Sequence, residues 1–314
     1  MLNEQRVSGP AEKSNTSIFG QAGDYLSLTK PPIILLLVVT AVGAMFLAAG
    51  GLPPLVLAVL VCVGGSLGAA GANALNHFLE QDIDALMSRT RQRPVPGHRI
   101  PPRSALVFGI LLNLLAFAVL AVWVNLLAAL LTMAATLFYV LVYTSWLKRN
   151  TPQNIVIGGA AGSIPPLVGW AGVTGGLDLP AVYLFTIIFF WTPPHFWALA
   201  LLIEKDYAAA GIPMLPVVAG RTNTVANIFI YSLVLIALTL VFALVSPVGW
   251  IYLGSSAVLG AVFILFAWLL LRNDSPRRAR VMYLYSLLYL ALLFVAIMAD
   301  SALSLIHICR CRRY

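Results

Sequence analysis

The stretch from residue 73 to residue 97, NALNHFLEQDIDALMSRTRQRPVPG, carries the side chains whose spacing best suits chemistry. Asn76, Glu80 and Asp84 are four residues apart, and Asn73 borders the same stripe. Because a step of four residues drifts by only about 40° around a helix, the three share one face over two turns. An amide and two carboxylates are hard oxygen ligands of the kind that Mg²⁺ accepts together with phosphate and water. The spacing therefore predicts a magnesium site at the end of a helix.

Three arginines follow this face, namely Arg89, Arg91 and Arg93. Their planar guanidinium groups suit phosphate oxygens. Carboxylates on a helix face followed by a run of arginines predict a site for a metal and a diphosphate. The alternative is a solvated loop of mixed charge, but such a loop does not need its acids on one common face.

A second polar segment is YTSWLKRNTPQN, in which Tyr143 and Ser145 stand one turn before Lys148 and Arg149. The two cations are candidates for binding an anion beside the first segment. The alternative is that they only anchor a helix end at the membrane surface, where Lys and Arg are common. The residues alone leave both interpretations open.

A third segment is WTPPHFWALALL, in which Pro193 and Pro194 are expected to interrupt a span just before His195. On a continuous helix, His195 and Asp206 would lie on one face about 16 Å apart along the axis. A lone histidine inside a membrane is commonly a hydrogen-bond partner between helices. Beside a proline kink and tryptophans it is also a candidate contact for a large flat ligand.

The elements that must position these residues are membrane helices. The chain has 314 residues, of which 61% are hydrophobic and 10% charged, and its mean hydropathy is +0.93. This composition excludes a water-soluble domain. The apolar runs are continuous, whereas strands of a membrane barrel alternate over about ten residues. The fold class is therefore all-α, a polytopic membrane protein with room for roughly eight to ten spans.

Nine apolar runs are bounded by Gly, Pro or charge and predict nine transmembrane helices, near residues 31–50, 54–77, 104–123, 125–147, 154–173, 180–203, 223–246, 249–271 and 282–300. The loops after the first, third, fifth and seventh runs contain no Lys or Arg, whereas the loops after the even-numbered runs do. By the positive-inside rule, the N-terminus and the even-numbered loops are expected in the cytoplasm and the C-terminus outside.

The two ends differ from the body of the chain. Residues 1–24 are polar and lack the apolar core of a signal peptide, so we expect a disordered cytoplasmic lead. The segment LSLIHICRCRRY would place three arginines on the outer side. We interpret residues 302–314 as a non-native tail, the alternative being a small metal-binding or surface-associating tail with Cys309 and Cys311.

The motifs resemble the UbiA superfamily of intramembrane prenyltransferases and, within it, the haem-modifying branch. The resemblance runs from LTKPP near Lys30 to about Asp300. Asn76-x3-Glu80-x3-Asp84 followed by SRTRQRPVP belongs to the whole superfamily. The segments YTSWLKRNTPQNIVIGGAAGSIPPLVGW, WTPPHFWALALL and DYAAAGIPML are typical of the haem branch. The resemblance implies one domain over residues 25–301, with nine helices around a central intramembrane cavity.

The resemblance also implies the activity. A farnesyl group would pass from farnesyl diphosphate to the 2-vinyl group of haem B, with addition of water, giving haem O and diphosphate for terminal oxidases. The implied place is the bacterial inner membrane, with the C-terminus in the periplasm. Implied partners are farnesyl diphosphate, haem B, the lipid bilayer, and haem A synthase or oxidase assembly factors, with no nucleic acid.

The resemblance assigns roles to particular residues. Mg²⁺ is the implied cofactor, with haem B as a substrate. The expected metal ligands are Asn76, Glu80 and Asp84, with Glu204 and Asp206 for a second metal or an arginine. The expected catalytic residues are Asn76, Glu80, Asp84, Lys148 and Tyr143, of which Tyr143 would face the carbocation. The expected substrate-binding residues are Arg89, Arg91, Arg93, Arg149, His195, Asp206 and Asn73.

The chain departs from the family pattern at three positions. Glu80 stands where the family usually has Asp, Leu202 where a further acid would complete the second helical face, and Pro32 where a basic residue is expected. A carboxylate is retained at Glu80, so metal binding would survive with a longer arm.

Two other functions compete with this interpretation. Within the superfamily, the acceptor could be a quinone precursor or a chlorophyll-type ring. From a different class, a nine-span chain with acids in its helices could be a transporter. Transporters commonly show two related halves with interrupted helices, and the sequence shows no such repeat. Its acids also fall at the ends of the spans.

Overall fold

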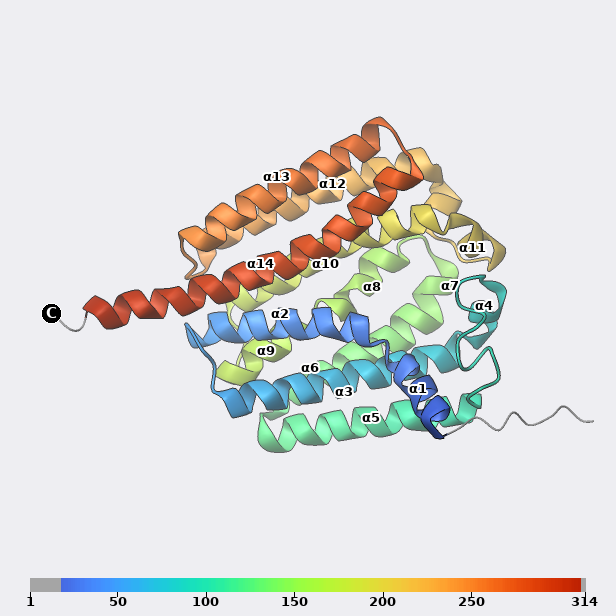
Figure 1. The fold of residues 1–314 in the computed structure, drawn as a ribbon, viewed down its shortest axis with the longest axis horizontal. Helices are drawn as coiled ribbons and strands as arrows, with labels where there is room; N and C mark the ends of the chain where they lie inside the picture. Colours follow the sequence, from blue (N-terminus) through green and yellow to red (C-terminus); the bar gives the residue numbers. More distant parts are fainter. Residues whose placement is uncertain (1–17, 312–314) are drawn as a thin grey trace, which may run out of the picture.

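The computed structural model describes residues 18–311, with side chains from residue 20 to residue 303, and this part of the chain is helical without a strand (Figure 1). In chain order the elements are α1 (Ile18–Thr29), α2 (Pro31–Ala49), α3 (Leu55–Leu79), α4 (Gln81–Leu86), α5 (Pro102–Trp123), α6 (Leu126–Leu137), η1 (Phe138–Leu147), α7 (Lys148–Asn150), α8 (Asn154–Gly162), α9 (Pro165–Thr174), α10 (Leu179–Leu202), α11 (Glu204–Ala209), α12 (Leu215–Val245), α13 (Trp250–Arg272) and α14 (Pro276–Cys311).

Nine spans long and apolar enough to cross a membrane lie in residues 18–311, which confirms the predicted all-α membrane fold. The fourth span combines α6, η1 and α7, and the fifth combines α8 and α9. The seventh begins at Leu215 and the ninth at Pro276, six to eight residues earlier than predicted. Arg277 ends an apolar run without ending α14, whereas α12 is kinked at Gly220, where φ 79° and ψ 166° are not helical, so its long part begins close to the predicted residue 223. The chain is a multi-pass membrane protein.

The structure describes only part of each of the two chain ends for which predictions were made. Helix α1 begins at Ile18, so residues 18–24 are helical where a disordered lead was expected. Residues 1–17 lie outside the described residues. Helix α14 continues to Cys311, and the side chains beyond residue 303, including Cys309 and Cys311, lie outside the described part. The interpretation of the tail as non-native stays a prediction.

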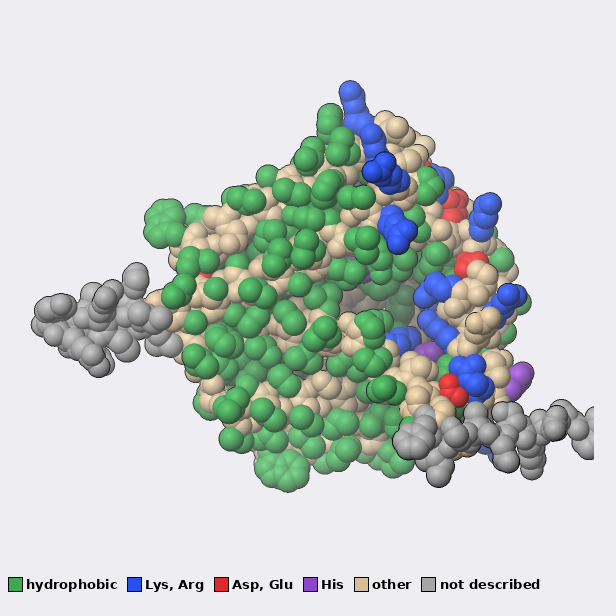
Figure 2. Space-filling view, viewed as in Figure 1, with side chains coloured by type: hydrophobic (Ala, Val, Ile, Leu, Met, Phe, Trp, Pro, Cys, Tyr) green, Lys and Arg blue, Asp and Glu red, His purple; other side chains and the backbone are tan. Residues whose placement is uncertain are grey.

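The polar chemistry is concentrated at one end of the bundle. In Figure 1, the short helices α1, α4, α7 and α11 gather at this end. Figure 2 shows most of the visible Lys, Arg, Asp and Glu side chains on the same end, while hydrophobic side chains predominate over the rest of the visible face. The face is hollowed beside some of these charged groups. We call this end, which carries Lys30, Arg89, Arg93 and Lys148, the basic end.

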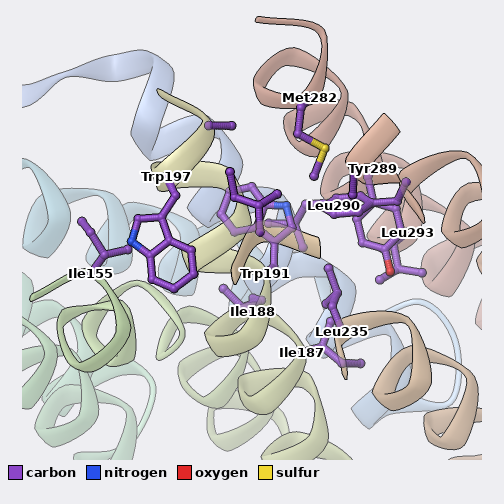
Figure 3. Packing of buried hydrophobic residues seen from close by; sticks show 14 of the residues in the cluster. Ile155, Ile187, Ile188, Trp191, Trp197, Leu235, Met282, Tyr289, Leu290 and Leu293 are labelled. Atoms are coloured by element: carbon purple, nitrogen blue, oxygen red, sulfur yellow. The ribbon is translucent and has the colours of Figure 1, made fainter. Parts of the chain in front are cut away.

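Helix α10 forms the centre of the largest hydrophobic core. Figure 3 shows Trp191 and Trp197 of this helix among aliphatic side chains of α8, α12 and α14. The indole nitrogen of Trp191 donates to the carbonyl oxygen of Ser286 in α14 at 2.8 Å. Between helices in lipid, where the hydrophobic effect is weak, such packing and hydrogen bonding hold the bundle together. The helices that carry the basic end are therefore held together by the packing around α10.

Small residues allow several helices to approach closely. At Gly169 of α9, an added Cβ would lie 2.2 Å from the carbonyl oxygen of Ala41 in α2. Gly169→Ala should therefore push α9 and α2 apart and destabilise the protein by about 1–3 kcal/mol, the usual cost of overpacking. Thermal unfolding in detergent measures the effect. Gly65→Ala in α3 is the matched control, because nothing lies within 4 Å of its added Cβ. Equal melting temperatures for the two variants would contradict the close α2–α9 contact.

Candidate functional site

Asn76, Glu80 and Asp84, which we call the acidic stripe, stay in line although their helix is broken at Glu80. Helix α3 ends at Leu79, and Glu80, with φ −101° and ψ 13°, separates it from α4. The backbone N–H of Glu80 still donates to Asn76, and the N–H of Asp84 donates to Glu80, at 2.9 and 2.8 Å. The four-residue spacing is thus kept across the junction. Asn76, Glu80 and Asp84 are each only 2% exposed.

Each oxygen-bearing side chain of this stripe contacts one cation of the basic end. These pairs are Asn76 Oδ1 with Lys30 Nζ at 2.8 Å, Glu80 Oε1 with Lys148 Nζ at 2.5 Å, and Asp84 with Arg93 Nη1 at 2.8 and 2.9 Å. Both acidic pairs have their carboxylate side chains 3% exposed. Lys148 and Arg93 are therefore more than surface anchors, because each compensates a buried charge.

Lys30 is a site residue that the sequence reasoning left out. It occupies the left-handed region, with φ 55° and ψ 63°, at the turn between α1 and α2. Burial, with a further contribution from Arg93, lowers the pKa of Lys30 to about 7. Asn73, expected to bind substrate, instead donates from Nδ2 to the carbonyl oxygen of Thr29 at 2.9 Å. It therefore holds the turn that presents Lys30.

A π-helix, η1, aligns the fourth span with the acidic stripe. Its wider turn is seen where the backbone N–H of Lys148 donates to the carbonyl oxygen of Tyr143, five residues earlier. The hydroxyl of Thr144, also on η1, accepts a 3.2 Å hydrogen bond from Asn76 Nδ2. Single π-turns are frequent at functional sites. No local sequence pattern predicted this one.

Tyr143 lies on the same π-helix and belongs to a group of tyrosines near Glu80. Its ring stacks on Tyr139 with centroids 5.5 Å apart and packs against Gly158 of α8. Tyr207 of α11 is close enough to interact electrostatically with Tyr143 and Glu80. Burial raises the pKa of Tyr207 to about 12, so its hydroxyl remains a donor. The structure thus places Tyr143 near Glu80 of the acidic stripe, and its role of facing a carbocation stays a prediction.

Arg149 has a structural partner instead of facing the acidic stripe. Its guanidinium forms two hydrogen bonds with Asp82, at 2.8 and 2.9 Å, and a third with the carbonyl oxygen of Leu79. The hydrogen bonds from Arg149 lower the pKa of Asp82. The contact clamps the end of α3 to α7. Substrate binding by Arg149 would require it to leave this clamp.

The predicted second metal site is not assembled in the described structure. Glu204 pairs with Arg221 at 2.7 Å, whereas Asp206 accepts hydrogen bonds from Ser88 at 2.9 and 3.0 Å. The two acids are two residues apart on α11, and such positions do not face each other on a helix. Glu204 therefore matches the alternative expectation, an arginine partner. Asp206 links α11 to the loop after α4.

His195 lies in a packed aromatic cluster. Its Nδ1 and the hydroxyl of Ser286 in α14 are 2.7 Å apart, and its ring stacks on Trp191 and Tyr283 at centroid distances of 4.4 and 4.9 Å. Helix α10 runs without interruption through the two prolines, so the predicted break before His195 is wrong. The helix ends instead at Leu202, which removes the expected shared face with Asp206. These contacts favour the helix-to-helix interpretation of His195.

The remaining arginines separate into two groups. Arg89 and Arg93 line a cavity of about 280 Å³ at the basic end, together with Lys30, His77 and Arg99. We call this cavity the basic pocket, and its other lining residues are Ser27, Gln92 and Pro94. Arg91 is exposed and is not part of its lining. The prediction of an arginine-rich anion site therefore applies to Arg89 and Arg93.

The donor chemistry of the stripe fits Mg²⁺. Among the described residues there is no group of three His, Cys, Asp or Glu side chains placed to share an ion. The stripe contains two carboxylates, and its third oxygen comes from the amide of Asn76. All three are hard oxygen donors buried at one helix end, the set that this cation accepts together with phosphate oxygens.

Comparison with known sequences gives one consistent family. The sequence model of the UbiA prenyltransferase family matches residues 36–299 of this chain. The chain is 51% identical over 299 residues to the protoheme IX farnesyltransferase of Gloeobacter violaceus, covering 95% of this chain and 98% of that protein. It is 50% identical over 299 residues to the protein of the same name from Roseiflexus castenholzii, covering 94% of this chain. The match spans only 56% of the length of the Roseiflexus protein.

Solved structures show the same fold at low sequence identity. A structure from a study of digeranylgeranylglyceryl phosphate synthase in membranes superposes with a TM-score of 0.73 at 18% identity, covering 90% of this chain and 99% of that one. A UbiA homolog from Archaeoglobus fulgidus bound to GPP and Mg²⁺ gives a TM-score of 0.61 at 19% identity, covering 88% and 99%. The fold of this chain thus occurs in a protein that binds a divalent cation and GPP.

Proposed function

This chain belongs to the UbiA prenyltransferase family, and from that premise we propose that it transfers a farnesyl group from farnesyl diphosphate to the 2-vinyl group of haem B. Water adds in the same reaction, and haem O and diphosphate are the products. The name shared by relatives at about 50% identity supports the acceptor. The observation that carries the reaction type is the buried stripe in which every oxygen ligand contacts a cation.

The difficult step is breaking the allylic C–O bond of farnesyl diphosphate. The electron pair leaves with the diphosphate, so the site must stabilise new negative charge. Asn76, Glu80 and Asp84 would hold Mg²⁺, which supplies charge neutralisation for the leaving group when bound. Lys30, Arg93 and Lys148 stand beside these three ligands and would bind the phosphate oxygens. Cations fixed in place before the reaction stabilise such charge without reorganisation.

The farnesyl cation must then meet the vinyl group before it meets water. The terminal vinyl carbon attacks C1 of the cation, and water adds to the new cation on the other vinyl carbon and loses a proton. Tyr143 and Tyr139 stack beside Glu80 and would present aromatic faces, which attract a cation. Tyr143 is partly buried against the apolar core around α10, and these apolar neighbours would keep water away from the intermediate.

The setting of the reaction is also part of the proposal. We propose that the basic end lies at the cytoplasmic surface of the bacterial inner membrane, because Lys and Arg accumulate on that side of membrane proteins. Farnesyl diphosphate would then bring its charged group from the cytoplasmic face, while its chain remains among the helices.

The test is a product assay with two acceptors in one reaction. Purified protein in detergent receives Mg²⁺, farnesyl diphosphate, haem B and a hydroxybenzoate, and mass spectrometry identifies the product. We expect a hydroxyfarnesyl adduct of haem and no prenylated benzoate. Prenylation of the benzoate alone would instead assign the chain to a quinone-forming branch of the family. Neither product, with labelled substrate crossing a vesicle membrane, would favour a transporter.

A further inference from the structure

The basic pocket contains a buried histidine that the proposed reaction has not used. His77 lies on the last turn of α3 beside Asn76 and is 2% exposed. Both ring nitrogens, Nδ1 and Nε2, are buried and have no hydrogen-bond partner in the structure. Buried polar groups are nearly always hydrogen-bonded, because leaving one unpaired is costly. His77 therefore needs a partner that the protein itself does not supply.

The charges around His77 indicate what that partner is. Two of the four cations lining the basic pocket are committed to carboxylates, Arg93 to Asp84 and Arg99 to Asp24. Lys30 contacts only a neutral amide, and Arg89 has no partner among the described residues. The acids near the pocket, Asp24, Glu80 and Asp84, are thus already paired with other cations, and Lys30 and Arg89 remain without a carboxylate partner. A neutral imidazole still offers one N–H donor. This combination suits an oxyanion.

The position of the pocket narrows the choice of oxyanion. Lys30 and Arg93 line the basic pocket and also contact Asn76 and Asp84 of the acidic stripe. An anion in the pocket would therefore touch the same cations as a diphosphate held at the stripe. The volume of about 280 Å³ is far more than a single water needs. The pocket adjoins the place where the leaving group must accumulate charge.

Resting on the proposed function, which places the diphosphate at these cations, we infer that His77 donates a hydrogen bond to a phosphate group in the basic pocket, both of the prenyl diphosphate and of the released diphosphate. Arg89 and Lys30 attract the phosphate group by their charge, and the hydrogen bond from His77 fixes its orientation. No proton is transferred between His77 and the phosphate in this role. His77 is thus a substrate-binding residue that orients the leaving group beside the acidic stripe.

The experiment measures binding of inorganic diphosphate to the purified full chain by titration calorimetry with Mg²⁺ present, without haem or a prenyl donor. We expect His77→Leu to weaken binding about tenfold, the effect of one hydrogen bond to a charged group. His77→Gln keeps a donor and should bind within about threefold of the unmodified protein. Arg103→Gln is the control, because Arg103 is exposed and lies outside the pocket lining.

The outcomes separate this inference from the proposed reaction. Diphosphate binding that is lost in His77→Leu and kept in His77→Gln supports the inference even if haem is not the acceptor. Equal affinity in the unmodified protein and in His77→Leu would overturn it. So would a His77→Leu variant that binds diphosphate normally but binds haem B weakly and haem B dimethyl ester normally, because the pocket would then serve haem carboxylates. If His77→Leu does not fold, Arg89→Gln must show the tenfold loss.

Discussion

Asp84→Asn should lower kcat for farnesyl transfer by about 10²–10³-fold and should also lower the melting temperature, because Arg93 loses the buried carboxylate with which it is paired. The substitution keeps the size of the side chain but removes a charge from a carboxylate that is 3% exposed and paired with Arg93. The loss of one preorganised electrostatic group at a reacting centre has this magnitude. A steady-state assay of haem O formation at saturating Mg²⁺ measures it.

Asp82→Asn is the matched control for this prediction. Asp82 lies on the same short helix, two residues away, but its side chain is 58% exposed and pairs with Arg149. Surface ion pairs contribute about 0–1 kcal/mol, so we expect a loss of less than fivefold. Similar losses in both variants would show that α4 tolerates no change, and the specific role of Asp84 would then be withdrawn.

Lys148→Met should lower kcat/KM by about 10²-fold and also destabilise the protein. The lysine supplies charge to the leaving group, and its removal leaves Glu80 buried without its partner. Breaking a buried ion pair from one side costs about 3–5 kcal/mol. Steady-state kinetics and thermal unfolding measure the two effects separately.

The double variant Lys148→Met with Glu80→Gln distinguishes the two effects. It removes the uncompensated carboxylate, so the melting temperature should recover while the activity stays low. Recovery of activity together with stability would show that Lys148 serves only to neutralise Glu80. In that case the leaving group does not depend on this cation.

The parts of the site that the sequence predicted correctly depend on local periodicity. Asn76, Glu80 and Asp84 stay in line although the helix breaks at Glu80, because backbone hydrogen bonds at four-residue spacing continue across the junction. The nine spans were predictable for a similar reason, since hydrophobic length alone decides whether a helix can cross a bilayer.

The parts that were missed depend on tertiary contacts. Extending the α10 helix to Asp206 assumed one continuous period, but the chain breaks at Ile203, with φ −121° and ψ 30°. The π-helix η1 exists where Tyr143 and Thr144 pack against other helices. The left-handed turn at Lys30 is fixed partly by Asn73, 43 residues later in the chain. No window of neighbouring residues contains that information.

The most direct test of the central claim is binding of radiolabelled farnesyl diphosphate to the purified protein, with Mg²⁺ and after its removal by a chelator. If Asn76, Glu80 and Asp84 hold the cation that neutralises the diphosphate, removal of Mg²⁺ should weaken binding at least tenfold. Returning Mg²⁺ should restore the affinity, and Asp84→Asn should show little dependence on the cation. Equal affinity of the unmodified protein with and without Mg²⁺ would contradict the metal-plus-diphosphate site at the basic end.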